Sequence, residues 1–179
     1  MKYRVKRHAV QQPLDQSYRL IPLTQGQNAI VDTKDFDWLN QWNWCARWDK
    51  DTKSFYAMRK IRKGDRWPDV MMARVILGCK PRKDSDHINH DTLDNRRNNL
   101  RSATRSQNKA NSDKYKGNKS GFKGVHRGGR KWIACIMHNG KRRVLGRFYS
   151  AKEAARAYDQ GAKRAFGEFA FLNFPNHED

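Results

Sequence analysis

The first sixty positions alternate between apolar and polar residues over short stretches, which is the period of β-strands. Trp42, Trp44, Ala46 and Trp48 give the plainest case, because every second residue there is apolar. The predicted elements are a short strand and turn over 20–26, strands over 29–32, 42–48 and 55–59, a polar turn over 49–54, and a short helix over 35–40 capped by Thr33. Together they predict a small antiparallel module. We expect its tryptophans to form the core, since large aromatic side chains bury the most area, and the alternative is stacking on nucleic-acid bases.

The last sixty positions predict a three-stranded sheet followed by one helix. The expected strands are 122–127, 131–138 and 141–148, and Asn139-Gly140 between the last two is a strong hairpin signal. Ser150 and Glu153 form a capping box for a helix that runs to Phe166 and ends at Gly167. Its packed stripe consists mainly of small residues, namely Ala154, Tyr158, Gly161, Ala162 and Ala165. Small side chains allow this helix to lie close to the sheet.

Between these regions the pattern predicts a basic loop over 61–68 and a short apolar helix over 71–77 that ends at Gly78. Residues 114–121 are rich in Lys, Gly, Asn and Ser, which is typical of a flexible linker. We therefore expect one domain over 1–113, a linker over 114–119 and a second domain over 120–175.

Charge points to a polyanionic partner. The 179 residues include 38 Lys and Arg against 18 Asp and Glu, for a formal net charge of +20 and a pI near 10.3. Fourteen of the basic residues and only one acidic residue fall in 101–150, whereas 14–57 has five basic and six acidic residues. A surplus of this size and unevenness favours nucleic acid.

The three cysteines are widely spaced and form no Cys-x-x-Cys, so the sequence predicts neither a zinc knuckle nor a disulfide framework. Residues 1–12 predict a mobile basic arm, which has no apolar core and is no secretory signal. The apolar runs near 70–77 are far too short to span a bilayer. We expect a soluble, cytoplasmic protein that binds no membrane.

Residues 86–108 carry the candidate chemistry. Asp86-His87 places a carboxylate beside an imidazole, Asn99 precedes a short strand, and Thr104 with Gln107 forms a capping box for a helix that carries Asn108. His87 is a possible general base, and the oxygens of Asp86 and Asn108 are possible ligands of a hard divalent ion. Such a set suits metal-assisted hydrolysis of a phosphodiester. Taken singly, each residue is also a common turn residue, so the ordered set carries the prediction.

This stretch resembles the HNH nuclease motif of phage proteins and homing endonucleases. The resemblance rests on the opening Asp-His pair, the loop text of 93–100 and the helical Asn108. It implies a strand–loop–strand–helix unit around one metal ion, Mg²⁺ or Mn²⁺. In that unit Asp86 and Asn108 hold the ion, His87 deprotonates the attacking water, and Asn99 orients the loop. The chain departs from the pattern at Ala73, where similar nucleases have a supporting His.

Residues 120–175 resemble the plant ethylene-response-factor DNA-binding domain, also called the AP-two domain. The residues that carry this resemblance are Gly124-Val125, Lys131-Trp132, Leu145-Gly146, Phe148, Glu153–Asp159 and Leu172–Pro175. It implies a three-stranded sheet laid in the major groove with the helix behind it. The candidate DNA-binding residues are Lys123, His126, Arg127, Arg130, Lys131, Met137, Arg142 and Val144. The first turn is about one residue short, which leaves Arg127 and Arg130 without one-to-one matches. Cys135, Met137 and Val144 replace family residues, so the plant target sequence does not carry over.

The sequence thus predicts an α+β protein with a small antiparallel N-terminal module, a ββα-metal HNH unit and a three-stranded antiparallel sheet packed on one helix. The function predicted is that of an HNH homing-type DNA endonuclease of a phage or bacterial genome. Its partners are double-stranded DNA and a metal ion, without a small-molecule cofactor, and the chain is expected to act as a monomer. Two alternatives stay open, a DNA-binding regulator with a decayed nuclease unit, favoured by Ala73, and an RNA-binding protein, favoured by the tryptophans.

Overall fold

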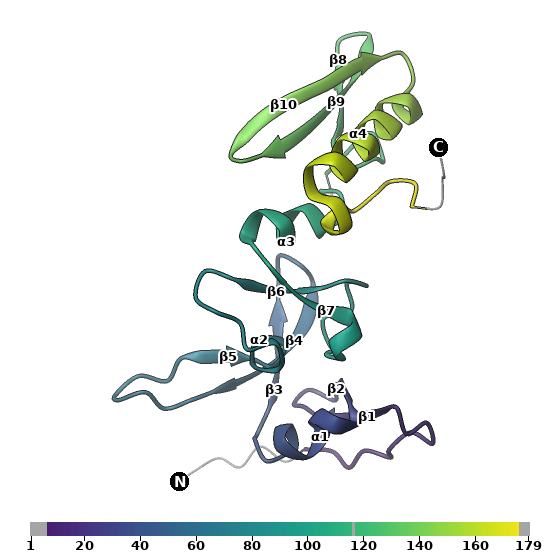
Figure 1. Cartoon of the computed structure of the whole chain (residues 1–179). Coiled ribbons are helices and arrows are strands. Elements are labelled where there is room, and N and C mark those ends of the chain that lie inside the picture. Colours follow the sequence, from purple (N-terminus) through teal and green to yellow (C-terminus); the bar gives the residue numbers. More distant parts are fainter. Residues whose placement is uncertain (1–6, 116, 176–179) are drawn as a thin grey trace. The chain divides into compact units, whose positions relative to one another are not determined.

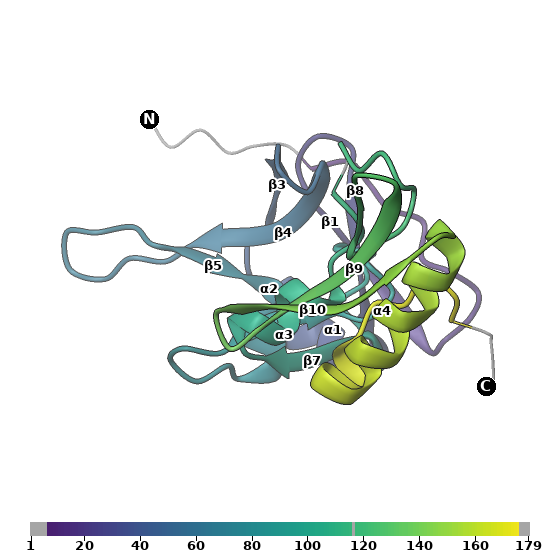
Figure 2. The same ribbon diagram turned by 90° about the horizontal axis from the view of Figure 1, so that it is seen from above.

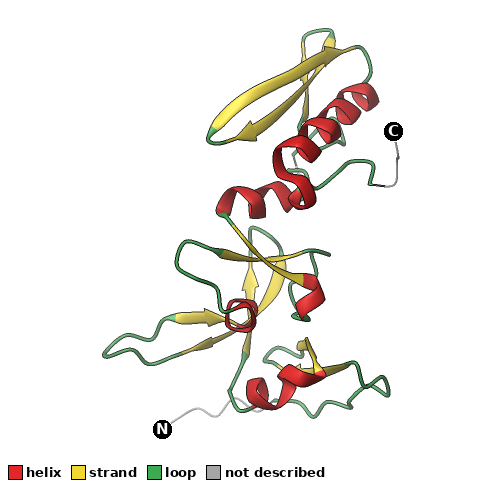
Figure 3. Cartoon of the chain, in the orientation of Figure 1, coloured by secondary structure: helices red, strands yellow, loops and turns green. Residues whose placement is uncertain are grey.

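The computed structural model describes residues 7–115 and 117–175, so residues 1–6 of the predicted basic arm lie outside the described residues. The chain divides into two compact units, unit 1 up to Ser102 and unit 2 from Ala103. Small antiparallel sheets and a few helices build both units, which confirms the α+β prediction (Figure 1, Figure 3). The predicted domain limits at 113 and 120 stay a prediction.

Unit 1 begins with the hairpin of β1 (Tyr18–Pro22) and β2 (Asn28–Asp32), whose register pairs Tyr18 with Asp32. Helix α1 (Thr33–Asn40) follows at once. Its N-cap is Asp32 rather than the predicted Thr33, whose hydroxyl donates instead to the carbonyl of Gln16. The Asp32 carboxylate accepts the backbone N–H of Arg97 at 2.7 Å. The N-cap residue of α1 thereby also holds the segment that begins η1.

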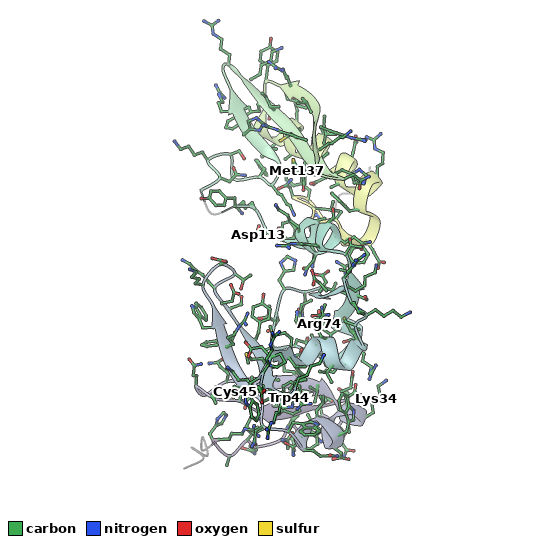
Figure 4. All side chains as sticks on the ribbon, turned by 90° about the vertical axis from the view of Figure 1, so that its left-hand side faces the viewer. Lys34, Trp44, Cys45, Arg74, Asp113 and Met137 are labelled. Carbon is green, nitrogen blue, oxygen red and sulfur yellow. The ribbon has the colours of Figure 1, made fainter. Side chains whose placement is uncertain are left out.

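A second sheet consists of β3 (Cys45–Asp49), β4 (Ser54–Lys60) and β5 (Asp69–Met71) in that order. The predicted strand over 42–48 was wrong at its start, and β5 was not predicted. Trp44 is fully buried and donates its indole N–H to the carbonyl of Leu39 at 2.8 Å (Figure 4). Trp42 and Trp48 are exposed. The tryptophan core is therefore confirmed for Trp44 but not for these two neighbours.

The rest of unit 1 comprises α2 (Met72–Leu77), β6 (Asp84–His87), the short 3-10 helix η1 (Arg97–Asn99) and β7 (Leu100–Ala103). Helix α2 ends as predicted at Gly78, whose φ of 58° is left-handed and suits glycine. Strands β6 and β7 pair as a two-stranded sheet. The core beneath these elements includes Ile21, Leu23, Val31, Leu39, Trp44, Met72, Ile76 and Leu100.

Unit 2 begins with α3 (Arg105–Asn111), where the predicted capping box of Thr104 and Gln107 is confirmed. Strands β8 (Val125–Gly128), β9 (Lys131–His138) and β10 (Lys141–Phe148) form an antiparallel sheet in the order β10-β9-β8. Helix α4 (Ala151–Phe166) lies along one face of this sheet, and η2 (Gly167–Phe169) follows it (Figure 1). Helix α3 packs against α4 and η2.

Close helix–sheet packing in unit 2 depends on two glycines. A Cβ on Gly161 of α4 would lie 2.6 Å from the side chain of Leu145, so a larger residue would displace that side chain or move the helix away from β10. Gly124 has a φ of 73°, and a Cβ there would overlap the ring of Tyr158. The first strand therefore begins at Val125 and not at the predicted Phe122. The predicted stripe of small residues on α4 is confirmed by the buried Ala154, Tyr158, Gly161 and Ala162.

Candidate nuclease site and nucleic-acid interface

Asn99 holds together the loop that follows His87. Its side-chain oxygen accepts the backbone N–H of Asn89 at 2.9 Å, and its amide nitrogen donates to the carbonyl of Asp94 at 2.8 Å. The backbone carbonyl of Asn99 also accepts the N–H of Ile88 at 2.9 Å. One buried side chain thus joins both ends of the loop, and its predicted catalytic role stays a prediction.

The same loop is attached to the β1–β2 hairpin through β2. The backbone N–H of Ile30 donates to the carbonyl of Leu93 at 2.9 Å, and the carbonyl of Ile30 accepts the backbone N–H of Asn95 at 2.7 Å. Two arginines of the motif also have structural partners. Arg96 pairs with Asp94 at 2.7 Å, and Arg97 pairs with Asp35 at 2.7 Å. The guanidinium of Arg97 lowers the pKa of Asp35 below its ordinary value. These cations therefore stabilise the loop.

His87 ends β6 and is 8% exposed. Burial lowers the pKa of its imidazole, so the ring is neutral at neutral pH, as a general base must be. Its Nε2 lies 3.4 Å from Oδ1 of Asn95, and the amide of Asn95 is oriented because its nitrogen donates to the carbonyl of Leu93. The Asn95 oxygen therefore accepts a hydrogen bond from Nε2–H, and in this tautomer the basic lone pair of the neutral ring is on Nδ1.

Asp86, the predicted metal ligand beside His87, is 3% exposed. Its Oδ2 accepts a hydrogen bond from Nε of Arg101 on β7 at 2.8 Å. This ion pair was not foreseen, because the sequence shows no periodic relation between the two residues and only the pairing of β6 with β7 makes them neighbours. Asn108, the other predicted ligand, lies on α3 in unit 2.

The donor chemistry fits a hard divalent ion. A buried carboxylate and an amide oxygen are ligands that Mg²⁺ accepts, and Mg²⁺ usually retains several waters in place of an all-protein cage. In the part of the chain that the structure describes, no group of three or more His, Cys, Asp and Glu side chains could hold a metal. A site of one carboxylate and one amide would depend on water and phosphate for its remaining ligands.

In unit 2 the face of the sheet opposite α4 brings together four of the predicted DNA-binding residues. Strand pairing places Arg142 opposite Met137 and Val144 opposite Cys135, and His126 lies opposite Ile133 on the same side. Nη2 of Arg142 donates to Nε2 of His126 at 2.8 Å. Met137 is 53% exposed (Figure 4), and Val144 is 60% exposed. The face is thus an open surface with both apolar and cationic groups.

Of the remaining candidates, Lys131 lies at the end of this same face, because it alternates with Ile133 and Met137 along β9, and the others lie away from it. Arg127 pairs with Trp132 in the register, and its guanidinium lies 4.8 Å from that ring, on the α4 side of the sheet. Lys131 covers the ring of Tyr149 at 4.6 Å, and Arg130 is exposed in the β8–β9 turn. Lys123 is partly buried, and its amine donates to the carbonyls of Ala110 and Ser112.

One residue of this face escaped the sequence analysis. The register of β10 shifts between Val144 and Gly146, which places Arg147 opposite Ile133, on the same face as His126 and separated from it by β9. Simple alternation from Arg142 would have placed Arg147 on the opposite face. A β-bulge is what reverses this assignment, and the glycine within the strand was the available signal for it.

Unit 1 contributes a basic ribbon. The hairpin of β4 and β5 continues beyond its strands, with Ile61 donating to Pro68 at 3.1 Å and Lys63 to Arg66 at 2.9 Å. Five Lys and Arg and one Asp fall in 59–67, and Trp67 is 57% exposed. Figures 1 and 2 show the hairpin extending away from the rest of unit 1. The predicted basic loop is therefore a two-stranded projection.

Comparison with known proteins finds partial similarity of two kinds. The chain is 50% identical over 48 residues to a dehydration-responsive element-binding protein of rice, Oryza sativa subsp. japonica, which is 26% of this chain and 15% of that protein. It is 46% identical over 68 residues to an ethylene-responsive transcription factor of Arabidopsis thaliana, 36% of this chain and 27% of that protein.

The second kind is viral. The chain is 35% identical over 88 residues to a protein described as an uncharacterized HNH endonuclease of Acanthamoeba polyphaga mimivirus, 49% of this chain and 46% of that protein. The chain thus spans less than half the length of each of these relatives. No family model and no solved structure matches. No helix within residues 7–115 and 117–175 is long and apolar enough to cross a membrane.

Proposed function

We propose that this protein is a metal-dependent DNA endonuclease of the HNH type, directed to its target by an AP-two-like domain. The observation that carries the proposal is the buried, neutral imidazole of His87 next to the carboxylate of Asp86, at the end of a loop held by Asn99. The partial similarity to a viral protein named as an HNH endonuclease supports this class of chemistry.

In the proposed reaction, Nδ1 of His87 accepts a proton from the water that attacks the scissile phosphate. A neutral imidazole is suited to this step, because one ring nitrogen carries a basic lone pair instead of a proton and the ring has no charge to desolvate. Asn99 keeps the loop closed around the imidazole through its bonds to Asn89 and Asp94.

Asp86 and Asn108 would hold the divalent ion, Mg²⁺ or Mn²⁺. The assignment of Asn108 rests on the sequence resemblance, since it lies in unit 2 and Asp86 lies in unit 1. A bound ion would polarise the phosphate and stabilise the charge on the leaving oxygen. Arg101 keeps the Asp86 carboxylate in one orientation.

The sheet of unit 2 would bind the target DNA and direct cleavage to it. His126, Met137, Arg142, Val144 and the newly placed Arg147 share one open face, and a sheet of this width is a known reader of the major groove. Arg130 and Lys131 would add phosphate contacts at its end, and the basic ribbon of unit 1 would add more. The similarity to proteins named as transcription factors and element-binding proteins supports duplex DNA as the partner.

A second candidate is a DNA-binding regulator without nuclease activity. Two observations favour it, the missing His at Ala73 and the ion pair by which Arg101 occupies one oxygen of the proposed metal ligand. The two candidates differ in one measurable property, which is hydrolysis.

The deciding experiment is incubation of the full chain with supercoiled plasmid in Mg²⁺, with and without chelator, beside a His87→Ala variant. The proposal expects nicked or linear product that chelator and His87→Ala both abolish. Equal product from the wild type and from His87→Ala would exclude His87 as the base and overturn the proposed mechanism. Absence of product with intact DNA binding would favour the regulator.

A further inference from the structure

The backbone of Lys123, which lies just before β8, is hydrogen-bonded to a residue of the C-terminal segment. Its N–H donates to Oδ1 of Asn173 at 2.7 Å, and its carbonyl accepts Nδ2 of Asn173 at 3.2 Å. Asn173 is in turn held by the carboxylate of Asp159 on α4, which accepts its backbone N–H at 2.9 Å. The root of the Lys123 side chain is therefore fixed to the sheet-and-helix body of unit 2.

The other end of that side chain reaches α3. Nζ of Lys123 donates to the carbonyl of Ala110 at 2.6 Å and also to the carbonyl of Ser112. The Ala110 carbonyl accepts a further hydrogen bond from the backbone N–H of Phe171 at 3.2 Å, and the Phe171 ring lies 5.4 Å from Nζ. Carbonyls at the end of a helix lack intrahelical partners and carry partial negative charge, so an amine suits them.

Lys123 differs in this respect from the other candidate DNA-binding cations. Arg130 and Arg142 are exposed, whereas Lys123 is partly buried, and burial lowers the pKa of its amine to about 8. A phosphate-binding lysine acts as a hydrated, fully charged group that faces the solvent. The donors of Lys123 are turned toward the protein instead, and an uncharged amine has two N–H groups that could still serve both carbonyls.

We propose that Lys123 is a positioning residue that fastens the C-terminal end of α3 to the β8–β10 sheet, and that it does not bind DNA phosphate. The AP-two resemblance assigns a DNA-facing role to this position, so in this chain the residue would have a different role. The consequence for catalysis rests on the proposed function, because α3 carries Asn108, the proposed metal ligand. The helix that presents the ligand and the sheet that binds DNA would then behave as one body.

The first test is hydrogen exchange of the full chain without DNA or metal, in Lys123→Met beside Arg142→Met. Loss of the two contacts should speed exchange about tenfold for the amides of Asn108 and Ser112, whose hydrogen bonds to Thr104 and Lys109 lie within and at the end of α3. Arg142→Met should leave these amides unchanged. Unchanged exchange in Lys123→Met would overturn the proposal.

The second test is DNA binding by gel shift at several salt concentrations. Lys123→Met and Lys123→Gln should keep the wild-type slope of log K against log salt, whereas Arg142→Met should lower it by about one. A slope lowered by about one in both Lys123 variants would show that the amine binds phosphate and would overturn the proposal. Lys123→Gln serves if Lys123→Met does not fold, because its amide retains two donors.

The third test is the kinetics of cleavage. A purely structural role of Lys123 would not lower kcat selectively. Lys123→Met should reduce kcat about tenfold with KM unchanged, and Lys123→Arg should restore part of the loss because its guanidinium again offers donors. Unchanged kcat in Lys123→Met would limit Lys123 to structural support and overturn the catalytic consequence. If the wild type does not cleave, the proposed function fails, while exchange and salt dependence still decide the role of Lys123.

Discussion

Arg101 and Asp86 form a nearly buried ion pair, with Nε of the arginine 2.8 Å from Oδ2 of the aspartate. Removing the arginine alone would leave a buried carboxylate without its cation, which typically costs about 3–5 kcal/mol of folding free energy. Arg101→Met should therefore lower the urea midpoint of unfolding substantially. The double variant Asp86→Asn/Arg101→Met should recover most of the loss, and a double variant no more stable than Arg101→Met would contradict the pairing.

Replacing His87 should separate catalysis from binding. His87→Ala should reduce the rate of DNA cleavage by about 10²–10⁴, the usual contribution of a general base, because no proton acceptor replaces it. DNA affinity should change little, since a buried imidazole offers few contacts to a ligand. A suitable control is His90→Asn, three residues along the same loop, where the positive φ of 66° is compatible with Asn. Wild-type cleavage by His87→Ala would exclude the proposed base.

The protonation of His87 makes a prediction about pH. Burial lowers its pKa below the ordinary value near 6.5, so an NMR titration of its ring protons should have a midpoint below that value. The unfolded chain binds this proton at higher pH than the folded chain does. The stability that the neutral ring contributes is thus complete above about pH 6.5 and is lost as the pH falls below it. A ring that titrates above 6.5 would contradict the buried, neutral imidazole.

The sheet of unit 2 predicts which arginines read DNA. Arg142→Ala and Arg147→Ala should each weaken binding to duplex DNA and lower the salt slope by about one if the side chain holds phosphate. A contact to a guanine edge would instead cost roughly 1–3 kcal/mol at one base position. Lys163→Ala, in the last turn of α4, is the matched loss of charge away from this face. Equal weakening by all three variants would show that DNA binding depends on the net charge of the protein and not on this face of the sheet.

The basic ribbon of unit 1 can be tested separately. Arg62→Ala/Lys63→Ala should weaken DNA binding uniformly across sequences and lower the salt slope by up to about two, because both side chains are exposed near its tip. Lys50→Ala/Lys53→Ala in the β3–β4 turn removes the same charge from another exposed turn of the same sheet. An effect of equal size from this control would show that the ribbon has no particular role.

Local patterns in the sequence determined much of the fold. The strands 131–138 and 141–148 were predicted to the residue, and the capping box of Thr104 and the stop at Gly78 were also found, because turns and caps are set by neighbouring residues. The ordered set of Asp86, His87, Asn99 and Asn108 could likewise be selected from the sequence. Its roles in metal binding and catalysis stay predictions.

Tertiary structure decided which side chains meet. The ion pair of Asp86 with Arg101 depends on the pairing of β6 with β7, and the position of Arg147 depends on a bulge that shifts the register of β10. Lys123 looks like any other basic residue in the sequence, yet its amine is bound to the end of α3. Alternation and spacing give the face of an element. Which partner occupies that face depends on contacts between distant segments, and these form only when the chain is folded.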